Sequence, residues 1–341
     1  MVTRVLAVLA AVAMVVGAIV VRANLDNNGA GGTTSPTTLR IVCATELAAV
    51  CEALDGQVGT TVEDASTTAA RLTTVGDGQE PPLDGWLVTA PWPEIVDGAR
   101  SRAGSEPFLD VGDVLARSPV VLAVNTTRSK VLAARCNAEV GWKCVGDAAG
   151  VAWQDLPNGR PEWGPVKVGH PPATTAGGLT IAGAAAVGYF DGSTDLSATE
   201  LADRGFQNWL RRLESGPQIP GSPLLTMLSR PSAFDVVGAL EAEAGPAIAT
   251  ASATKPVLLY PSPVATADVV LATSDGGAGR RVAELLAGTA ARRALAAAGW
   301  RVDGVPPAAG IRTSVKLPTT SNLPEPDVLD ALRSAVEQAG R

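Results

Sequence analysis

Histidine and aromatic side chains are scarce in this 341-residue sequence, which has one histidine, His170, together with 7 Trp, 4 Phe and 2 Tyr. A zinc site built from several histidines is therefore excluded. Any Ser-His-Asp or Cys-His catalytic arrangement would have to use His170. With so few rings, the core has to be formed mainly by Ala, Val and Leu.

An excess of positive charge is also missing. The 27 Lys and Arg residues are outnumbered by 34 Asp and Glu, which leaves a net charge of −7 at neutral pH. A general nucleic-acid-binding protein needs a basic face to neutralise phosphates, so we expect no nucleic-acid partner. Hydrophobic residues make up 46% of the chain and charged residues 18%. That is enough apolar material for one or two packed domains and too much for disorder of the whole chain.

Motifs for catalysis and phosphate binding are lacking too. The Gly-rich stretch Ser274–Gly279 precedes a predicted helix but has no Gly-Lys-Ser/Thr ending, so it reads as an ordinary helix start. No nucleophile, base and orienting group can be named as a set. We therefore predict that the protein is not an enzyme and uses no cofactor.

The N-terminus carries a small-and-apolar run, residues 5–21, between Arg4 and Arg22. At a rise of about 1.5 Å per residue the run spans roughly 25 Å, slightly less than a bilayer core of about 30 Å. Residues 1–23 are therefore either an uncleaved signal anchor or a signal peptide cleaved near Ala23. In the first case the protein is a single-pass cell-membrane protein with an extracytoplasmic body, and in the second it is secreted.

Residues 24–38 are rich in Gly, Asn, Ser and Thr and are predicted to be a flexible linker. Four cysteines follow, and in an exported chain they predict two disulfides. Cys136 and Cys144 lie in a turn-prone stretch where a local bridge is plausible, which leaves Cys43 and Cys51 as the second pair. The sequence alone allows three connectivities, and four reduced buried thiols are an open alternative.

From residue 39 onward, short apolar runs alternate with helical patterns, which predicts an α/β fold with mainly parallel sheets. The predicted strands are 39–43, 83–89, 118–125, 166–169, 257–260 and 268–273. The predicted helices are 45–54, 93–102, one that begins after Thr174-Thr175, 198–214, 232–243, 279–286 and 290–298.

Three segments resemble those of extracellular solute-binding proteins with the type 2 periplasmic-binding-protein fold. Ser118–Val124 (SPVVLAV) resembles the strand that first crosses between the two lobes, and His170–Leu179 (HPPATTAGGL) resembles the helix start of the second lobe. Ala283–Arg301 resembles the closing helices. The resemblance implies two lobes with two crossings: lobe 1 from residues 39–122 and 256–303, lobe 2 from 123–255, and a C-terminal extension, 304–341, with a terminal helix.

Among these proteins, the sequence looks most like the solute-binding half of actinobacterial surface proteins that also carry a von Willebrand factor A domain. Arg301–Gly304 and Asp327–Arg341 resemble the end of that half. No Asp-x-Ser-x-Ser metal motif is present, so we expect any A domain to belong to a separate partner protein. A membrane permease is the other partner that the resemblance implies.

The resemblance implies that a small polar or anionic ligand is captured between the lobes, at a helix N-terminus that offers backbone N–H groups. The alternative function is a degenerate binding-protein fold that serves as a protein-interaction or scaffold domain at the cell surface.

Three features of the predicted site have alternatives. The helix start could equally be a capped core helix without a ligand. Trp92 could either stack on a ligand or pack in the core, and His170 could line the cleft or lie in a surface loop. The predicted ligand-binding residues are Thr45, Thr89, Ser118, Thr174, Thr175, Gly177 and Tyr260.

Overall fold

A computed structural model describes residues 39–54, 56, 58–252, 255–274 and 277–340. The predicted N-terminal anchor or signal, 1–23, and the linker, 24–38, lie outside these residues. Within the described ranges, no helix has the length and the apolar character that a membrane span requires.

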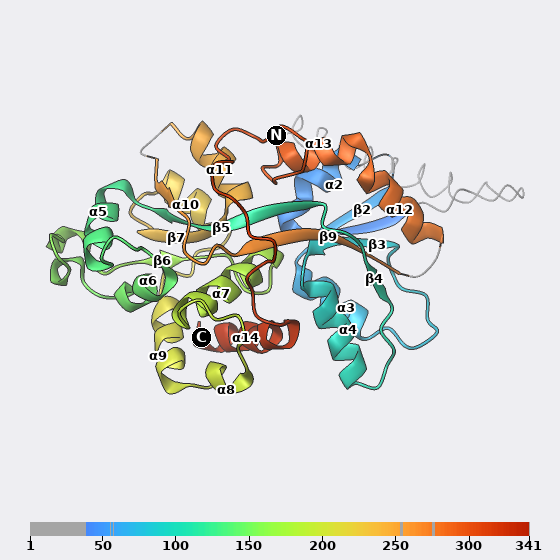
Figure 1. Ribbon diagram of the computed structural model, residues 1–341, viewed down its shortest axis with the longest axis horizontal. Coiled ribbons are helices and arrows are strands. Elements are labelled where there is room, and N and C mark those ends of the chain that lie inside the picture. Colours follow the sequence, from blue (N-terminus) through green and yellow to red (C-terminus); the bar gives the residue numbers. More distant parts are fainter. Residues whose placement is uncertain (1–38, 55, 57, 253–254, 275–276, 341) are drawn as a thin grey trace, which may run out of the picture. The chain divides into compact units, whose positions relative to one another are not determined.

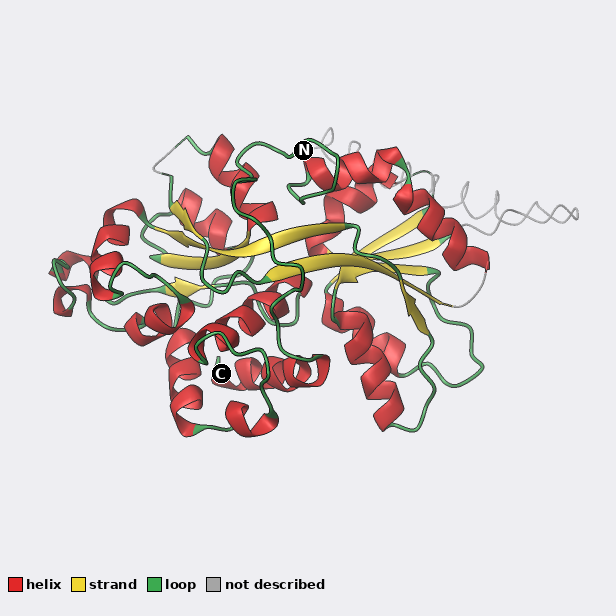
Figure 2. Ribbon diagram, in the orientation of Figure 1, coloured by secondary structure: helices red, strands yellow, loops and turns green. Residues whose placement is uncertain are grey.

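The strands and helices follow the α/β alternation that the sequence predicts (Figures 1 and 2). The strands are β1 (Arg40–Ala44), β2 (Gly59–Glu63), β3 (Gly85–Thr89), β4 (Leu109–Val111), β5 (Ala116–Val124), β6 (Val168–Gly169), β7 (Val236–Leu240), β8 (Val257–Leu259) and β9 (Thr266–Ser274). The α-helices are α2 (Ala48–Leu54), α3 (Ala65–Thr73), α4 (Trp92–Arg102), α5 (Thr126–Arg135), α6 (Trp142–Ala148), α7 (Ala176–Tyr189), α8 (Ala198–Leu201), α9 (Arg204–Leu213), α10 (Pro223–Ser229), α11 (Glu241–Thr250), α12 (Gly277–Ala287), α13 (Thr289–Ala297) and α14 (Pro326–Ala339). The described residues also form three 3₁₀ turns: η1 (Thr45–Leu47), η2 (Trp153–Asp155) and η3 (Pro161–Trp163).

The strands hydrogen-bond in the order β2-β1-β3-β9-β5-β7-β6, with β4 beside β9 and β8 beside β5. Only the pairs β1–β2, β1–β3 and β6–β7 are parallel among the described strands. The prediction of mainly parallel sheets was therefore wrong. The reason is that β5 and β9, the strands that run between the two halves, are antiparallel to the strands on either side of them.

Two lobes meet at β5. Its first part, Ala116–Pro119, pairs with β9, and its second part, Val120–Val124, pairs with β7 and β8. Lobe 1 holds β1 to β4, β9, α2 to α4, α12 and α13, whereas lobe 2 holds β6 to β8 and α5 to α11 (Figure 1). The pairing changes between Pro119 and Val120 and again between Leu259 and Thr266, whereas the lobe limits were expected at residues 122 and 256.

Burial explains why the central strands form where they do. Every residue of β3 and β7 is buried, as is β5 apart from Arg117. The stretch 232–243 was predicted to be one helix, and this was wrong: Val236–Leu240 is a strand and the helix begins at Glu241. A short apolar run of this kind is compatible with a helix or a strand. Here it forms a strand, and all of its residues are buried within the fold.

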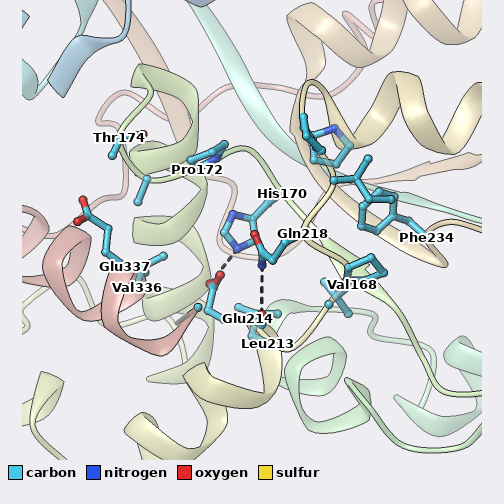
Figure 3. Close-up of a pocket in the computed structure, with 18 of the residues that line it drawn as sticks. Val168, His170, Pro172, Thr174, Leu213, Glu214, Gln218, Phe234, Val336 and Glu337 are labelled. Atoms are coloured by element: carbon cyan, nitrogen blue, oxygen red, sulfur yellow. Dashed lines mark hydrogen bonds and ion pairs between the residues drawn. The ribbon is translucent and has the colours of Figure 1, made fainter. Parts of the chain in front are cut away.

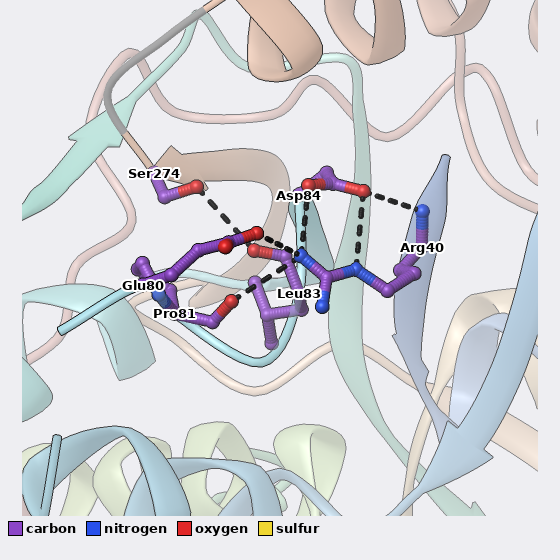
Figure 4. A network of polar contacts seen from close by, with 6 residues as sticks. All are labelled: Arg40, Glu80, Pro81, Leu83, Asp84 and Ser274. Carbon is purple, nitrogen blue, oxygen red and sulfur yellow. Dashed lines mark hydrogen bonds and ion pairs between the residues drawn. The ribbon is translucent and has the colours of Figure 1, made fainter. Parts of the chain in front are cut away.

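A polar network fixes the outer end of lobe 1 (Figure 4). Asp84 Oδ2 accepts the backbone N–H of Arg40 at 2.7 Å, and Asp84 Oδ1 accepts Nη2 of the same residue at 3.2 Å. The same guanidinium also donates to Glu80 and to the carbonyl of Pro81. The start of β1 is thereby tied to the loop that leads into β3.

The C-terminal extension passes across β5 and β9 before it reaches α14 (Figure 1). Arg117 of β5 donates to the carbonyl of Pro318 at 3.0 Å, and the N–H of Thr266 donates to the carbonyl of Ser321 at 2.9 Å. Helix α14 then packs against α4 of lobe 1 and against α7, α8 and α9 of lobe 2. The extension therefore contacts both lobes.

Candidate functional site: the cleft between the lobes

A cavity of about 670 Å³ lies between the two lobes and is called the cleft below. Lobe 1 contributes Thr45, Glu46, Ala48, Ala49, Asp64, Ala298 and Trp300. Lobe 2 contributes Pro171, Pro172, Thr175, Gly177, Ile181, Gly221, Ser222, Leu240, Ala242 and Glu243. The volume lies within the range typical of small-molecule sites. The walls are largely apolar, and their charged groups are all carboxylates.

Helix α7 begins at the cleft. Thr175 is its N-cap: Thr175 Oγ1 accepts the N–H of Gly178 at 3.0 Å and donates to the carbonyl of Pro172 at 3.0 Å. The helix is apolar all round and buried from Ala176 to Val187, so packing holds its start rigidly. Glycines let neighbours come close: a Cβ at Gly177 would lie 3.0 Å from Glu46 Oε1.

The start of α7 is also where lobe 2 touches lobe 1. The N–H of Gly177 donates to Glu46 Oε1 at 2.6 Å, and the carbonyl of Thr174 accepts the N–H of Ser66 at 3.0 Å. Thr89 Oγ1 donates to the carbonyl of Ala176 at 3.4 Å. Three elements of lobe 1 therefore meet one helix terminus, and the cleft is closed at this point.

Glu46 is presented by the turn η1, directly after the buried strand β1. A disulfide between Cys43, in β1, and Cys51, in α2, spans this turn. The second disulfide joins Cys136 and Cys144 in lobe 2, so both expected pairs are bridged. Since β1 is buried and the bridge ties α2 back to it, the position of the Glu46 backbone is strongly constrained.

Three carboxylates share the cleft: Glu46 and Asp64 from lobe 1 and Glu243 from lobe 2. Thr45 Oγ1 links the first two, at 3.3 Å from Glu46 Oε2 and 3.4 Å from Asp64 Oδ1, while Ser222 donates to Glu243. Burial raises the pKa of the Glu243 carboxyl; the Ser222 hydrogen bond opposes this, and the charge of Glu46 raises it further. Across the part of the chain that the structure describes, none of the three carboxylates forms an ion pair.

No group of His, Cys, Asp or Glu in the described ranges is arranged to hold a metal ion. Glu46 and Asp64 lie on the lobe 1 side of the cleft and Glu243 on the lobe 2 side. Such a wall can balance the positive charge of an organic group, with the apolar surfaces of Leu240 and Trp300 beside it.

Of the predicted ligand-binding residues, Thr45, Thr175 and Gly177 line the cleft. Thr174 is turned to the other side of the helix start and lines a second cavity. The expected oxyanion position at the N–H of Gly177 is taken by the chain's own Glu46.

Thr89, Ser118 and Tyr260 do not line the cleft. Thr89 and Ser118 are completely buried, and Ser118 Oγ accepts the N–H of Ala242 at 2.9 Å at the start of α11. Tyr260 donates to Glu241, which also pairs with Arg301 at 2.7 Å. Burial and the hydrogen bond to Glu241 raise the pKa of the Tyr260 phenol. All three side chains hold the lobes and their connections together.

His170 lines the second cavity, of about 420 Å³, in lobe 2 beside α14 (Figure 3). It is neither a cleft residue nor exposed in a loop, because it is buried against Glu214. Trp92 is 1% exposed and packs beside α3 and α14, so the packing alternative holds for this ring. Trp300 is 1% exposed and forms part of the cleft wall.

Asp64, Ser222 and Glu243 were not among the predicted site residues. Asp64 follows β2, a strand with polar, partly exposed residues and no apolar alternation. Glu243 lies in the first turn of α11, within the stretch that was read as part of a longer helix. A correct strand prediction at 236–240 would have placed Glu243 at the carboxyl end of a strand, where open α/β sheets bind ligands.

No protein-family model matches the sequence, and no curated protein matches it. Solved structures match over almost the whole chain. A periplasmic thiamin binding protein aligns with a TM-score of 0.56 and 13% identity, over 91% of this chain and 98% of that protein. Apo FutA2 from Synechocystis PCC6803 aligns with a TM-score of 0.54 and 15% identity, over 90% and 99%. The periplasmic binding protein AfuA from Actinobacillus pleuropneumoniae aligns with a TM-score of 0.52 and 12% identity, over 90% and 97%. The predicted two-lobed periplasmic-binding-protein fold is confirmed.

Proposed function

We propose that this chain is an extracytoplasmic solute-binding protein that captures a small, positively charged organic solute between its two lobes. One observation carries the proposal: a cleft of about 670 Å³ is lined from both sides by carboxylates and apolar side chains. No Lys, Arg or His is among its described lining residues. A cation would relieve the repulsion between Glu46 and Glu243, and its apolar part would lie against Leu240 and Trp300.

A negatively charged solute, which the helix start alone had favoured, would face all three carboxylates. Like charges in a partly buried site repel strongly because little water screens them. The similar structures include one protein named for thiamin and one with fructose-6-phosphate bound. Since this fold accommodates different solutes, the class of solute is inferred from the cleft of this chain.

We also propose that the protein is attached to the membrane through residues 5–21. Its proposed partner is a permease or a separate von Willebrand factor A domain protein. Mass analysis of the protein purified from its own host distinguishes the two N-terminal alternatives. An intact residue 1 supports the anchor, and an N-terminus at Asn24 supports the cleaved signal and a secreted body.

The test of binding is calorimetric titration and thermal shift with a fixed panel: thiamin, choline and arginine as cations, glucose as a neutral solute, and sulfate and citrate as anions. We expect a cation to raise the melting temperature and the anions to have no specific effect. Glu243→Gln should weaken cation binding roughly tenfold, because a charge-assisted contact is lost. Glu52→Gln, an exposed change on α2, is the matched control.

Stronger stabilisation by sulfate or citrate than by any cation would contradict the proposed charge selectivity. A second function, that of an interaction or scaffold domain, is favoured by the Glu46–Gly177 contact, which closes the cleft with a side chain of the protein itself. Absence of binding by every member of the panel would support this second function.

A further inference from the structure

The N–H of Gly177 is the group of α7 that an anion would approach from the cleft. In the first turn, the N–H of Gly178 is already bound to Thr175 Oγ1, and the N–H of Leu179 is bound to the carbonyl of Thr175. Gly177 instead donates across the cleft, to Glu46 Oε1 at 2.6 Å. A carboxylate at a helix N-terminus interacts favourably with the unpaired N–H groups and with the helix dipole.

Glu46 reaches this position from the opposite lobe. Its second oxygen, Oε2, accepts only a weak hydrogen bond from Thr45 at 3.3 Å, and the structure gives it no basic partner within the described ranges. One oxygen of this carboxylate therefore closes the cleft on α7, and the other remains beside the cavity.

The carboxylate thus occupies the place where an oxyanion would bind, and it adds negative charge to the space around it. We propose that Glu46 is a specificity-determining residue, which stands in for an anionic ligand at the start of α7, excludes oxyanions from the cleft and directs it toward positively charged solutes. This inference rests on the proposed solute-binding function of the same cleft.

If Glu46 excludes oxyanions by occupying the N–H of Gly177, a variant that lacks this side chain should gain oxyanion binding. Glu46→Ala and Glu46→Ser leave side chains too short to reach Gly177, so that its N–H becomes free for a small oxyanion. Glu46→Gln keeps a carbonyl oxygen in reach and removes the charge. It therefore separates occupancy of the N–H from charge repulsion.

The probe is inorganic sulfate, titrated against the full chain by calorimetry at constant ionic strength with chloride as the reference salt. A fixed ionic strength is needed because sulfate stabilises folded proteins by exclusion from their surface as well as by binding. In parallel, the amide resonance of Gly177 reports binding at this position.

We expect the wild-type protein and the Glu52→Ala control to show no saturable sulfate binding. Glu46→Ala and Glu46→Ser should show saturable sulfate binding, at least roughly tenfold tighter than the weakest affinity that the titration detects, with a shift of the Gly177 resonance. Glu46→Gln should gain less than the two shorter variants, because its side chain still covers the N–H.

Three results would overturn the inference: no gain in either short variant, an equal gain in Glu52→Ala, or a gain without a change at Gly177. Its failure is distinguishable from failure of the proposed function. The proposed function fails if the wild-type protein binds no solute of the panel, whereas the sulfate result depends only on the variants of Glu46.

Discussion

His170 Nε2 lies 2.9 Å from Glu214 Oε1, and each side chain is only 8% exposed. The other ring nitrogen, Nδ1, lies 2.8 Å from the carbonyl oxygen of Pro171, to which a protonated ring donates. Burial acts to lower the pKa of His170, but the charge of Glu214 and the hydrogen bonds to Glu214 and Pro171 outweigh it and raise the pKa to about 9.

This raised pKa predicts a loss of stability at alkaline pH. The protonated ring stabilises the folded state fully below its ordinary pKa of about 6.5, and the stabilisation is lost as the pH rises through about 9. We expect up to about 3 kcal/mol of the free energy of unfolding to disappear across this window. Urea denaturation at pH 6 and pH 9.5 measures it. In His170→Gln the loss should be absent, and an equal loss in both proteins would refute the assignment to His170.

The two disulfides provide a matched pair of variants, because each closes a loop with a sequence separation of 8. Replacing either pair by serines should lower the free energy of unfolding by about 2.5 kcal/mol. Only the Cys43→Ser/Cys51→Ser variant should speed hydrogen exchange at the Gly177 amide, because only this bridge spans Glu46. Equal exchange in the two variants would show that the bridge does not position this carboxylate.

Ser118 distinguishes a structural hydroxyl from a ligand-binding one. Ser118→Ala removes the acceptor of the buried Ala242 N–H and should cost about 1 kcal/mol of stability without changing solute affinity. Thr175→Val removes a helix cap that also lines the cleft, so it should lower both stability and affinity. Denaturation and titration of both variants test this. A weaker affinity in Ser118→Ala would place its hydroxyl in the site after all.

Leu329 tests the docking of the C-terminal helix. It is fully buried in α14, and its Cδ2 packs at Gly183 of α7. Leu329→Ala should lower the free energy of unfolding by about 3 kcal/mol, whereas Leu225→Ala, at a position 55% exposed, should change it by less than about 0.5 kcal/mol. Equal small effects in urea denaturation would mean that α14 contributes little to the folded state.

The sequence predicted the fold well where burial leaves a distinct pattern. The apolar run around Val120 predicted the crossing strand, and the Thr175 helix start predicted one wall of the cleft. Both signals are local: the first is a run of β-branched residues, and the second is a capping hydroxyl followed by glycines.

The remaining part of the site depends on distant contacts. Glu46 and Gly177 are 131 residues apart, and nothing in the local sequence of either shows that they meet. Thr89 and Ser118 were correctly placed at strand ends or crossings, yet packing turned both hydroxyls toward backbone groups. Two of the three carboxylates, Asp64 and Glu243, come to line the same cleft only when two unpredicted strands, β2 and β7, take their places.

Helix α14 has a mechanical consequence for the cleft. Two bodies joined only by neighbouring strands, as by β5 and β9, can rotate about the line through them. A third attachment away from that line resists this rotation, and α14 provides one between α4 and α7 (Figure 1). Nη2 of Arg102 in lobe 1 lies 3.5 Å from Oδ2 of Asp330 in this helix, while Leu329 packs against Gly183 of lobe 2. Wide separation of the lobes therefore requires α14 to detach from one of them. A force that pulls on α14 would consequently change how far the two lobes can separate at the cleft.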